Sequence, residues 1–108
     1  MMGPRQFDLL KKDSYFIAVS RGGLYDTPAL VKALDSKKLA GAGLDVTEPE
    51  PLPKGHALWN FPNVVITPHI AGQSPGSFDR RVGVIRDNIG RFVRGERLIN
   101  VVDKQKGY

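Results

Sequence analysis

The stretch "NVVITPHIAG", Asn63–Gly72, decides the fold of this chain. Its residues 64–67 form a continuous apolar run of strand length. Pro68 then interrupts the strand, and a histidine and a turn of small residues follow. The chain has only one other histidine, so the position of His69 directly beyond a buried strand needs an explanation.

Two other short apolar runs resemble the first: "YFIAVS", residues 15–20, and the end of "GAGLDV", residues 43–46. They are continuous rather than alternating, which is typical of a parallel sheet covered on both faces. Helices are predicted after Gly3-Pro4, over 28–37 and over 75–94, the last as one amphipathic stripe from Phe78 to Phe92. The predicted fold is therefore α/β, with a thin sheet that looks like part of a larger one and has an open apolar edge.

Composition limits the function classes. A length of 108 residues allows one domain at most, and the absence of cysteine excludes disulfides, zinc–thiolate sites and a cysteine nucleophile. No apolar run approaches the ~18 residues of a membrane span. The net charge is +5, with eight basic against four acidic residues over 74–108. No stacking aromatics alternate with these charges, so we expect a solvated helix face rather than a nucleic-acid surface.

Polar side chains follow each predicted strand. Arg21 follows the first, Asp45 ends the second with Glu48 and Glu50 close behind, and His69 follows the third. The carboxyl ends of parallel strands meet at one edge of a sheet, where ligands bind in doubly wound folds. Arginine binds a carboxylate and polarises a carbonyl, and histidine exchanges a proton near neutral pH. Together they suit a 2-oxo or 2-hydroxy acid.

Structural roles compete with this interpretation. Arg21 alone could pair with a helix end or a surface acid, and a lone histidine after a strand is more often structural. Asp45 could cap a turn, and "EPEP" could be a solvated loop. His56 is expected to be structural or exposed and Trp59 to lie in the core or an interface, and a metal site would need more ligands.

The segment "FIAVSRGGLYDTPALVKALDSKKLAGAGLDVTEPEPLP…LWNFPNVVITPHIAG" resembles the C-terminal half of the D-isomer-specific 2-hydroxyacid dehydrogenases. The blocks "VSRGG", "GLDVTEPEPL" and "NVVITPHIAG" occur in the order and spacing of that family. The resemblance implies the second half of a Rossmann-type doubly wound parallel sheet with a long C-terminal helix. Residues 1–74 would be the C-terminal half of a dinucleotide-binding domain, and residues 75–108 a crossover helix and tail towards a substrate domain.

The resemblance also implies roles. Arg21 matches the substrate-binding arginine, His69 the general acid/base and Glu50, rather than Glu48, its carboxylate partner. The cofactor would be NAD or NADP, with no metal, and the substrate a small 2-oxo or 2-hydroxy acid such as glyoxylate, hydroxypyruvate or pyruvate. The positions that match the cofactor site are Ser20, Arg21, Asp45, His69, Ala71 and Gly72.

The sequence departs from the family in lacking G-x-G-x-x-G and the position downstream that selects NAD or NADP. We therefore expect an N-terminally truncated fragment with little activity alone, from a cytoplasmic, homo-oligomeric and usually dimeric parent. Two alternatives are a non-catalytic corepressor-like module of the same fold and a truncated product without its own function. The presence of Arg21, Glu50 and His69 together favours the enzyme.

Overall fold

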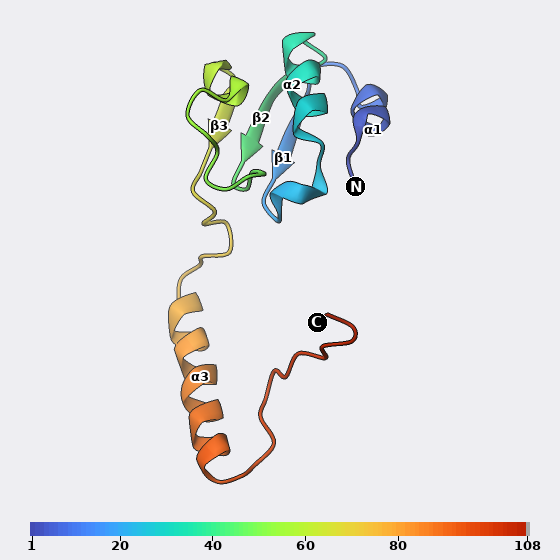
Figure 1. Cartoon of the computed structure of the whole chain (residues 1–108). Helices are drawn as coiled ribbons and strands as arrows, with labels where there is room; N and C mark the ends of the chain where they lie inside the picture. The colour runs from blue at the N-terminus through green and yellow to red at the C-terminus, as the bar shows by residue number, and fades with distance from the viewer. Residues whose placement is uncertain (108) are drawn as a thin grey trace. The chain divides into compact units, whose positions relative to one another are not determined.

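The elements follow one another as predicted, helix–strand–helix–strand–strand–helix, with two short 3-10 helices added (Figure 1). This computed structural model describes residues 1–107. The elements are α1 (Pro4–Leu9), β1 (Ser14–Ala18), η1 (Gly22–Leu24), α2 (Thr27–Asp35), β2 (Leu39–Leu44), η2 (Ala57–Asn60), β3 (Val64–Ile66) and α3 (Ser77–Val93).

The boundaries differ from the predictions where local chemistry outweighs the apolar pattern. The predicted strand over 43–46 is β2, which begins earlier because Leu39 already pairs with Ser14 of β1. Helix α2 begins at Thr27 because the carboxylate of Asp26 accepts a hydrogen bond from the Ala29 amide and caps the helix. Helix α3 begins only at Ser77, after Gly76 at φ +74°.

The three strands form one parallel sheet in the order β1-β2-β3, which confirms the predicted sheet type. Residues 14–18 of β1 pair with β2 on one side, and Val64–Ile66 of β3 pairs with it on the other. Because all three strands run the same way, their carboxyl ends share one edge, and the loops that leave that edge begin close together.

One face of the sheet carries the core. Helix α2 packs against β2 there, and Leu30 of α2 is fully buried (Figure 1). The rings of Phe7 and Tyr25 both pack edge-to-face on Phe16 of β1, with centroids 5.1 and 5.3 Å away. The largest fully buried side chains are those of Phe7, Leu30, Leu39, Leu44, Val46 and Leu58.

The prediction that both sheet faces are covered is wrong for residues 1–72. Alternate residues of β1 and β3 point away from the core, and Tyr15 is 71% exposed and Val65 65% exposed. A continuous apolar strand thus shows that a face suits burial, but the residues that bury it have to come from elsewhere. Ile17 and Val19 extend the same exposed surface.

The chain divides into two compact units after Gly72. The second unit contains α3, whose expected apolar stripe is present but exposed from Phe78 to Phe92. Its C-terminal half is tied to the tail, because the Asn88 side chain bonds both the N–H and the carbonyl of Ile99. No helix among residues 1–107 is both long enough and apolar enough to cross a membrane.

Candidate active site

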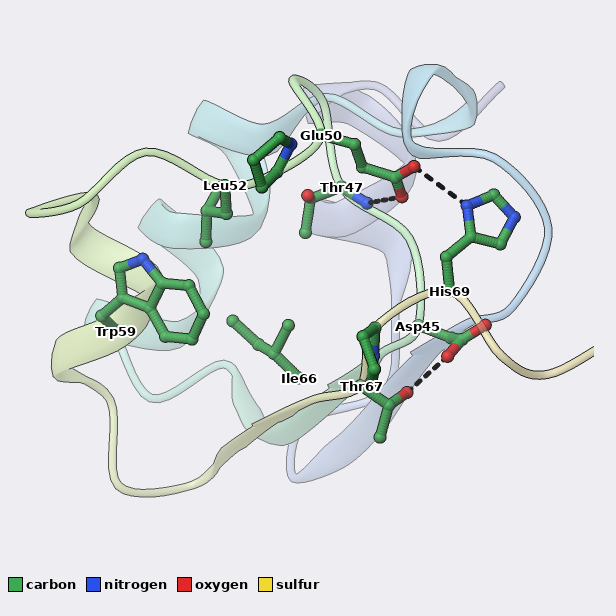
Figure 2. Close-up of a pocket in the computed structure, with 10 residues that line it drawn as sticks. Asp45, Thr47, Glu50, Leu52, Trp59, Ile66, Thr67 and His69 are labelled. Carbon is green, nitrogen blue, oxygen red and sulfur yellow. Dashed lines mark hydrogen bonds and ion pairs between the residues drawn. The ribbon is translucent and has the colours of Figure 1, made fainter.

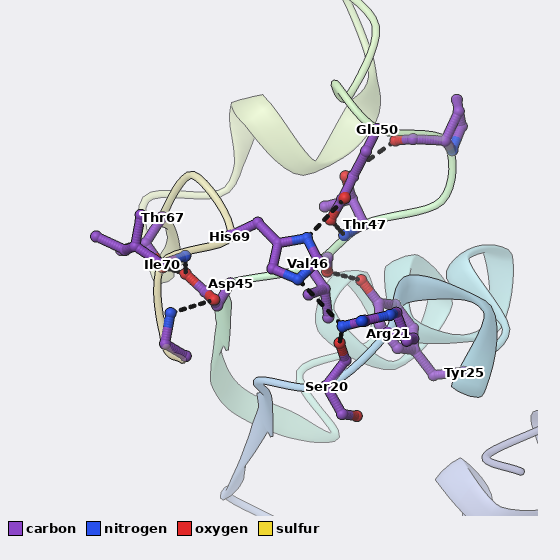
Figure 3. A network of polar contacts seen from close by, with 12 residues as sticks. Ser20, Arg21, Tyr25, Asp45, Val46, Thr47, Glu50, Thr67, His69 and Ile70 are labelled. Carbon is purple, nitrogen blue, oxygen red and sulfur yellow. Dashed lines mark hydrogen bonds and ion pairs between the residues drawn. The ribbon is translucent and has the colours of Figure 1, made fainter. Parts of the chain in front are cut away.

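The strand ends bring the predicted side chains together. Arg21 lies three residues after β1, Asp45 directly after β2 and His69 three residues after β3 (Figure 3). Glu50 joins them from the loop after Asp45. Parallel pairing alone therefore gathers residues that are up to 48 positions apart in sequence.

The imidazole of His69 lies between a cation and a carboxylate. Its Nδ1 is 2.9 Å from Oε2 of Glu50, and its Nε2 is 3.2 Å from Nη1 of Arg21 (Figure 3). A guanidinium can only donate, so Nε2 accepts and the ring proton sits on Nδ1, where it is donated to Glu50. His69 and Glu50 are each 40% exposed at their side chains, so the site remains open to a ligand.

Glu50, not Glu48, is the partner of His69. Its second oxygen, Oε1, accepts a hydrogen bond of 3.0 Å from the Thr47 amide, which fixes the carboxylate as it faces the ring. The hydrogen bond with His69, the Thr47 amide and the charges of His69 and Arg21 hold the pKa of Glu50 below its usual value. Glu50 is thus an ionised acceptor that selects the Nδ1–H tautomer.

Asp45 is buried, 5% exposed, and holds the loop that carries His69. Its Oδ1 accepts from the Thr67 hydroxyl at 2.6 Å and the Ile70 amide at 2.9 Å, and its Oδ2 accepts from the Ala71 amide at 2.7 Å. The hydrogen bond from Thr67, followed by those from the two amides, keeps the pKa of Asp45 low. Asp45 is therefore an ionised anchor for both sides of the loop around His69.

Gly22 lets the arginine approach the acidic loop. A Cβ atom built on Gly22 would lie 2.0 Å from the carbonyl oxygen of Thr47 and 2.7 Å from the amide nitrogen of Glu48. Only glycine fits this contact, which brings the segment after Arg21 directly against the loop that holds Glu50. The carbonyl of Ser20 also accepts a 2.7 Å hydrogen bond from Nη1 of Arg21 and orients the guanidinium.

The remaining predicted positions lie at the same edge. Ala71 reaches Asp45 through its backbone amide, and Gly72 leaves open space, with no atom within 4 Å of a Cβ built on it. Both residues are exposed. Ala71 therefore borders the site through its backbone, and Gly72 follows it in the chain.

Three residues that form hydrogen bonds at or near the site were not predicted from the sequence: Tyr25, Thr47 and Thr67. The Tyr25 hydroxyl donates a buried 2.8 Å hydrogen bond to the Val46 carbonyl, and burial, with the nearby charge of Glu50, raises its pKa to about 12. Their hydroxyl side chains form no recognisable motif. Thr67 follows β3 directly and Thr47 lies three residues after β2, so their closeness to strand ends was the available signal, whereas Tyr25, seven residues after β1, gave none.

A pocket of about 380 Å³ adjoins the site on the Glu50 side. Leu52, Trp59 and Ile66 give it apolar walls, and the Nε2 edge of His69 points away from them (Figure 2). Trp59 is half exposed, and its indole donates to the Pro53 carbonyl, while His56 accepts from the Leu58 amide and caps η2. His56 therefore has a structural role, which is one of the two roles expected for it.

This parallel α/β unit, with polar residues at the carboxyl ends of its strands, belongs to the class of doubly wound ligand-binding folds. The sequence profile described as "D-isomer specific 2-hydroxyacid dehydrogenase, NAD binding domain" matches residues 1–71. The chain belongs to this family, which confirms the resemblance stated from the sequence.

Individual members of this family are similar to the chain in sequence and in structure. The chain is 43% identical over 96 residues to a glyoxylate reductase of Thermofilum pendens, which covers 89% of the chain and 28% of that protein. An NADPH-dependent glyoxylate/hydroxypyruvate reductase of Sinorhizobium meliloti, solved with NADP and sulfate, superposes with a TM-score of 0.80 at 36% identity, over 99% of this chain and 35% of the other. A D-lactate dehydrogenase of Lactobacillus jensenii, solved with NAD+, gives 0.83 at 32% identity, over 96% and 35%. The chain spans about a third of the length of these relatives.

Proposed function

We propose that this chain is the catalytic part of an NAD(P)-dependent oxidoreductase that interconverts a small 2-oxo acid and its D-2-hydroxy acid. The observation that carries the proposal is the row Arg21–His69–Glu50, in which a guanidinium and a carboxylate flank an exposed imidazole beyond the ends of a parallel sheet. The relatives named for glyoxylate, hydroxypyruvate and D-lactate chemistry support the same substrate class.

Each residue has one task in the proposed reaction. Arg21 binds the substrate carboxylate with its guanidinium and polarises the neighbouring carbonyl. His69, in its protonated form, gives the proton on Nε2 to the carbonyl oxygen during reduction and removes the hydroxyl proton in the reverse direction. Glu50 holds the ring through Nδ1 and stabilises the imidazolium.

The residues present fit the nicotinamide end of a dinucleotide. Oδ2 of Asp45 accepts one donor from the chain and has capacity for another, which suits a carboxamide, and Gly72, which follows Ala71, leaves open space around itself. Ser20 and Ala71 border the same edge. When bound, the nicotinamide supplies or accepts the hydride. The chain has no G-x-G-x-x-G to hold the pyrophosphate, so we expect weak dinucleotide binding and little turnover by the chain alone.

Within this proposal, residues 1–74 are the C-terminal half of a dinucleotide-binding domain, and residues 75–108 are a crossover helix and tail. We further propose that the complete enzyme is cytoplasmic and homo-oligomeric. The exposed apolar residues on β1 and α3 support association, because Ile17 and Phe92 are both exposed. Light scattering tests whether this chain associates with itself. A chain that stays monomeric at all concentrations contradicts association through these apolar residues.

Titration with pyruvate, followed by NMR of the isotopically labelled chain, tests the site without a cofactor. We expect saturable shifts of the Arg21 Nε–H and of the His69 ring, and loss of the His69 shift in Arg21→Met. Arg86→Met is the matched control, because Arg86 belongs to α3 in the second compact unit and not to the strand-end residues that form the site. A spectrum in which neither Arg21 nor His69 responds, or in which Arg21→Met responds as the wild type does, contradicts the proposal.

A further inference from the structure

We infer that Asp45 is a positioning residue for His69, acting through the backbone of the loop 67–71 and not through the imidazole. The inference rests on the proposed function of His69 as the acid/base group. It extends that proposal, since it gives Asp45 a task that needs no dinucleotide.

The loop needs such an anchor because His69 adopts a positive φ of 53°. This left-handed conformation is uncommon for residues with a side chain and costs free energy unless the surroundings hold it. The only local support within the loop is a bond of 3.0 Å from the His69 amide to the Thr67 carbonyl. His69 itself is exposed, so side-chain packing does not provide the rest.

Asp45 supplies the missing support from both sides of the histidine. It binds the Thr67 hydroxyl before His69, and the Ile70 and Ala71 amides after it, at 2.6, 2.9 and 2.7 Å. These are charge-assisted bonds from a buried carboxylate, which are shorter and stronger than neutral ones. Three donors around one anion fix where the backbone at His69 turns, and hence where its ring points.

The anchor is itself fixed to the sheet. The Asp45 amide donates to the Ala18 carbonyl of β1 at 2.8 Å, and the Thr67 amide donates to the Leu44 carbonyl of β2 at 2.9 Å. The position of the imidazole relative to Glu50 and Arg21 is therefore set by the ends of all three strands. Without Asp45, the 2.9 Å contact between Nδ1 and Glu50 loses its geometric basis.

Asp45→Asn tests this with little change in size. An amide offers one oxygen and one NH2 group, so its NH2 faces either the Ala71 amide or the Thr67 and Ile70 donors, and at least one donor loses its acceptor. We expect the neutral His69 ring, observed by NMR through its ring nitrogens, to change from the Nδ1–H form towards Nε2–H. Hydrogen exchange of the Ile70 and Ala71 amides should accelerate on the order of tenfold or more.

Asp26→Ala is the control for a merely structural effect. It removes the carboxylate that caps α2 and should lower stability while the His69 tautomer stays as in the wild type. If Asp45→Asn does not fold, Thr67→Val serves instead, because it removes one donor to Oδ1 and leaves the carboxylate in place. A smaller shift in the same direction is then expected.

A folded Asp45→Asn that keeps the wild-type tautomer overturns the inference, as does an unchanged Thr67→Val where Asp45→Asn is unfolded. These readouts need neither substrate nor cofactor. The inference can therefore fail while pyruvate still binds at Arg21, and the proposed function can fail while the tautomer responds as expected.

Discussion

Replacing Gly22 with alanine should disturb the site through its backbone contacts. The new Cβ would lie 2.0 Å from the Thr47 carbonyl oxygen, and an ordinary contact begins at 3.4 Å, so the two segments must separate by roughly 1.4 Å. Both contacting atoms are backbone, and the Thr47 amide also holds Glu50. The strain therefore passes to the segment of Arg21 or to the loop of Glu50.

The expected cost follows from this geometry. Inserting a methyl group into a packed contact costs about 1–3 kcal/mol of the free energy of unfolding. A displacement near 1 Å also costs about a hundredfold in rate when it separates catalytic groups. We thus expect Gly22→Ala to lower stability by about 1–3 kcal/mol and to weaken the contact between Arg21 and His69.

Gly23→Ala is a closely matched control. A Cβ on Gly23 would have its nearest neighbour, the Oε2 of Glu48, at 3.9 Å, so the methyl group has space. Urea unfolding, followed through Trp59 fluorescence, measures both variants, and NMR of the Arg21 Nε–H reports on the site. Equal stability of the two variants would refute the reasoning, because it would mean that the close approach at Gly22 has no consequence.

Three further predictions concern burial, charge and pH. Leu44→Ala should lower the free energy of unfolding by about 2–5 kcal/mol, because Leu44 is buried. Val65→Ala should lower it by well under half as much, because Val65 is exposed. Equal losses in urea unfolding would contradict a one-sided core. The stability lost in Asp45→Asn should be constant above pH 3.8, the pKa of this aspartate in the unfolded chain, and should shrink as the pH falls through its lower pKa in the folded chain. A difference in urea midpoints that persists to the lowest measurable pH would count against an ionised anchor. In a complete enzyme, Glu50→Gln should shift the pH profile of reduction towards acid, because the imidazolium loses its carboxylate partner; an unchanged profile would remove Glu50 from the pair.

More of the candidate site than of the surrounding packing could be predicted from the sequence. Continuous apolar runs predicted a parallel sheet, and parallel strands bring Arg21, Asp45 and His69 to one edge, whereas the strand order β1-β2-β3 comes from the structure. The choice of Glu50 over Glu48 needed the family resemblance, because two neighbouring loop carboxylates look alike until the Thr47 amide selects one.

Other features could not be predicted because they depend on backbone contacts. The close approach of Gly22 to Thr47 involves residues 25 positions apart and leaves no pattern in either segment. The prediction that both sheet faces are buried failed for a different reason. The apolar residues of β1 make one sheet face suitable for burial, but the exposed Tyr15 shows that residues 1–72 do not cover this face.

The most direct test of the central claim is turnover in a hybrid enzyme. In this hybrid the present chain replaces the matching third of the Thermofilum pendens glyoxylate reductase, to which it is 43% identical. Oxidation of NADH or NADPH is followed in absorbance with glyoxylate as substrate. We predict turnover that falls by about 10²–10⁴-fold in His69→Asn. A folded hybrid that binds the cofactor but does not turn over, or one whose rate is unaffected by His69→Asn, would contradict the account.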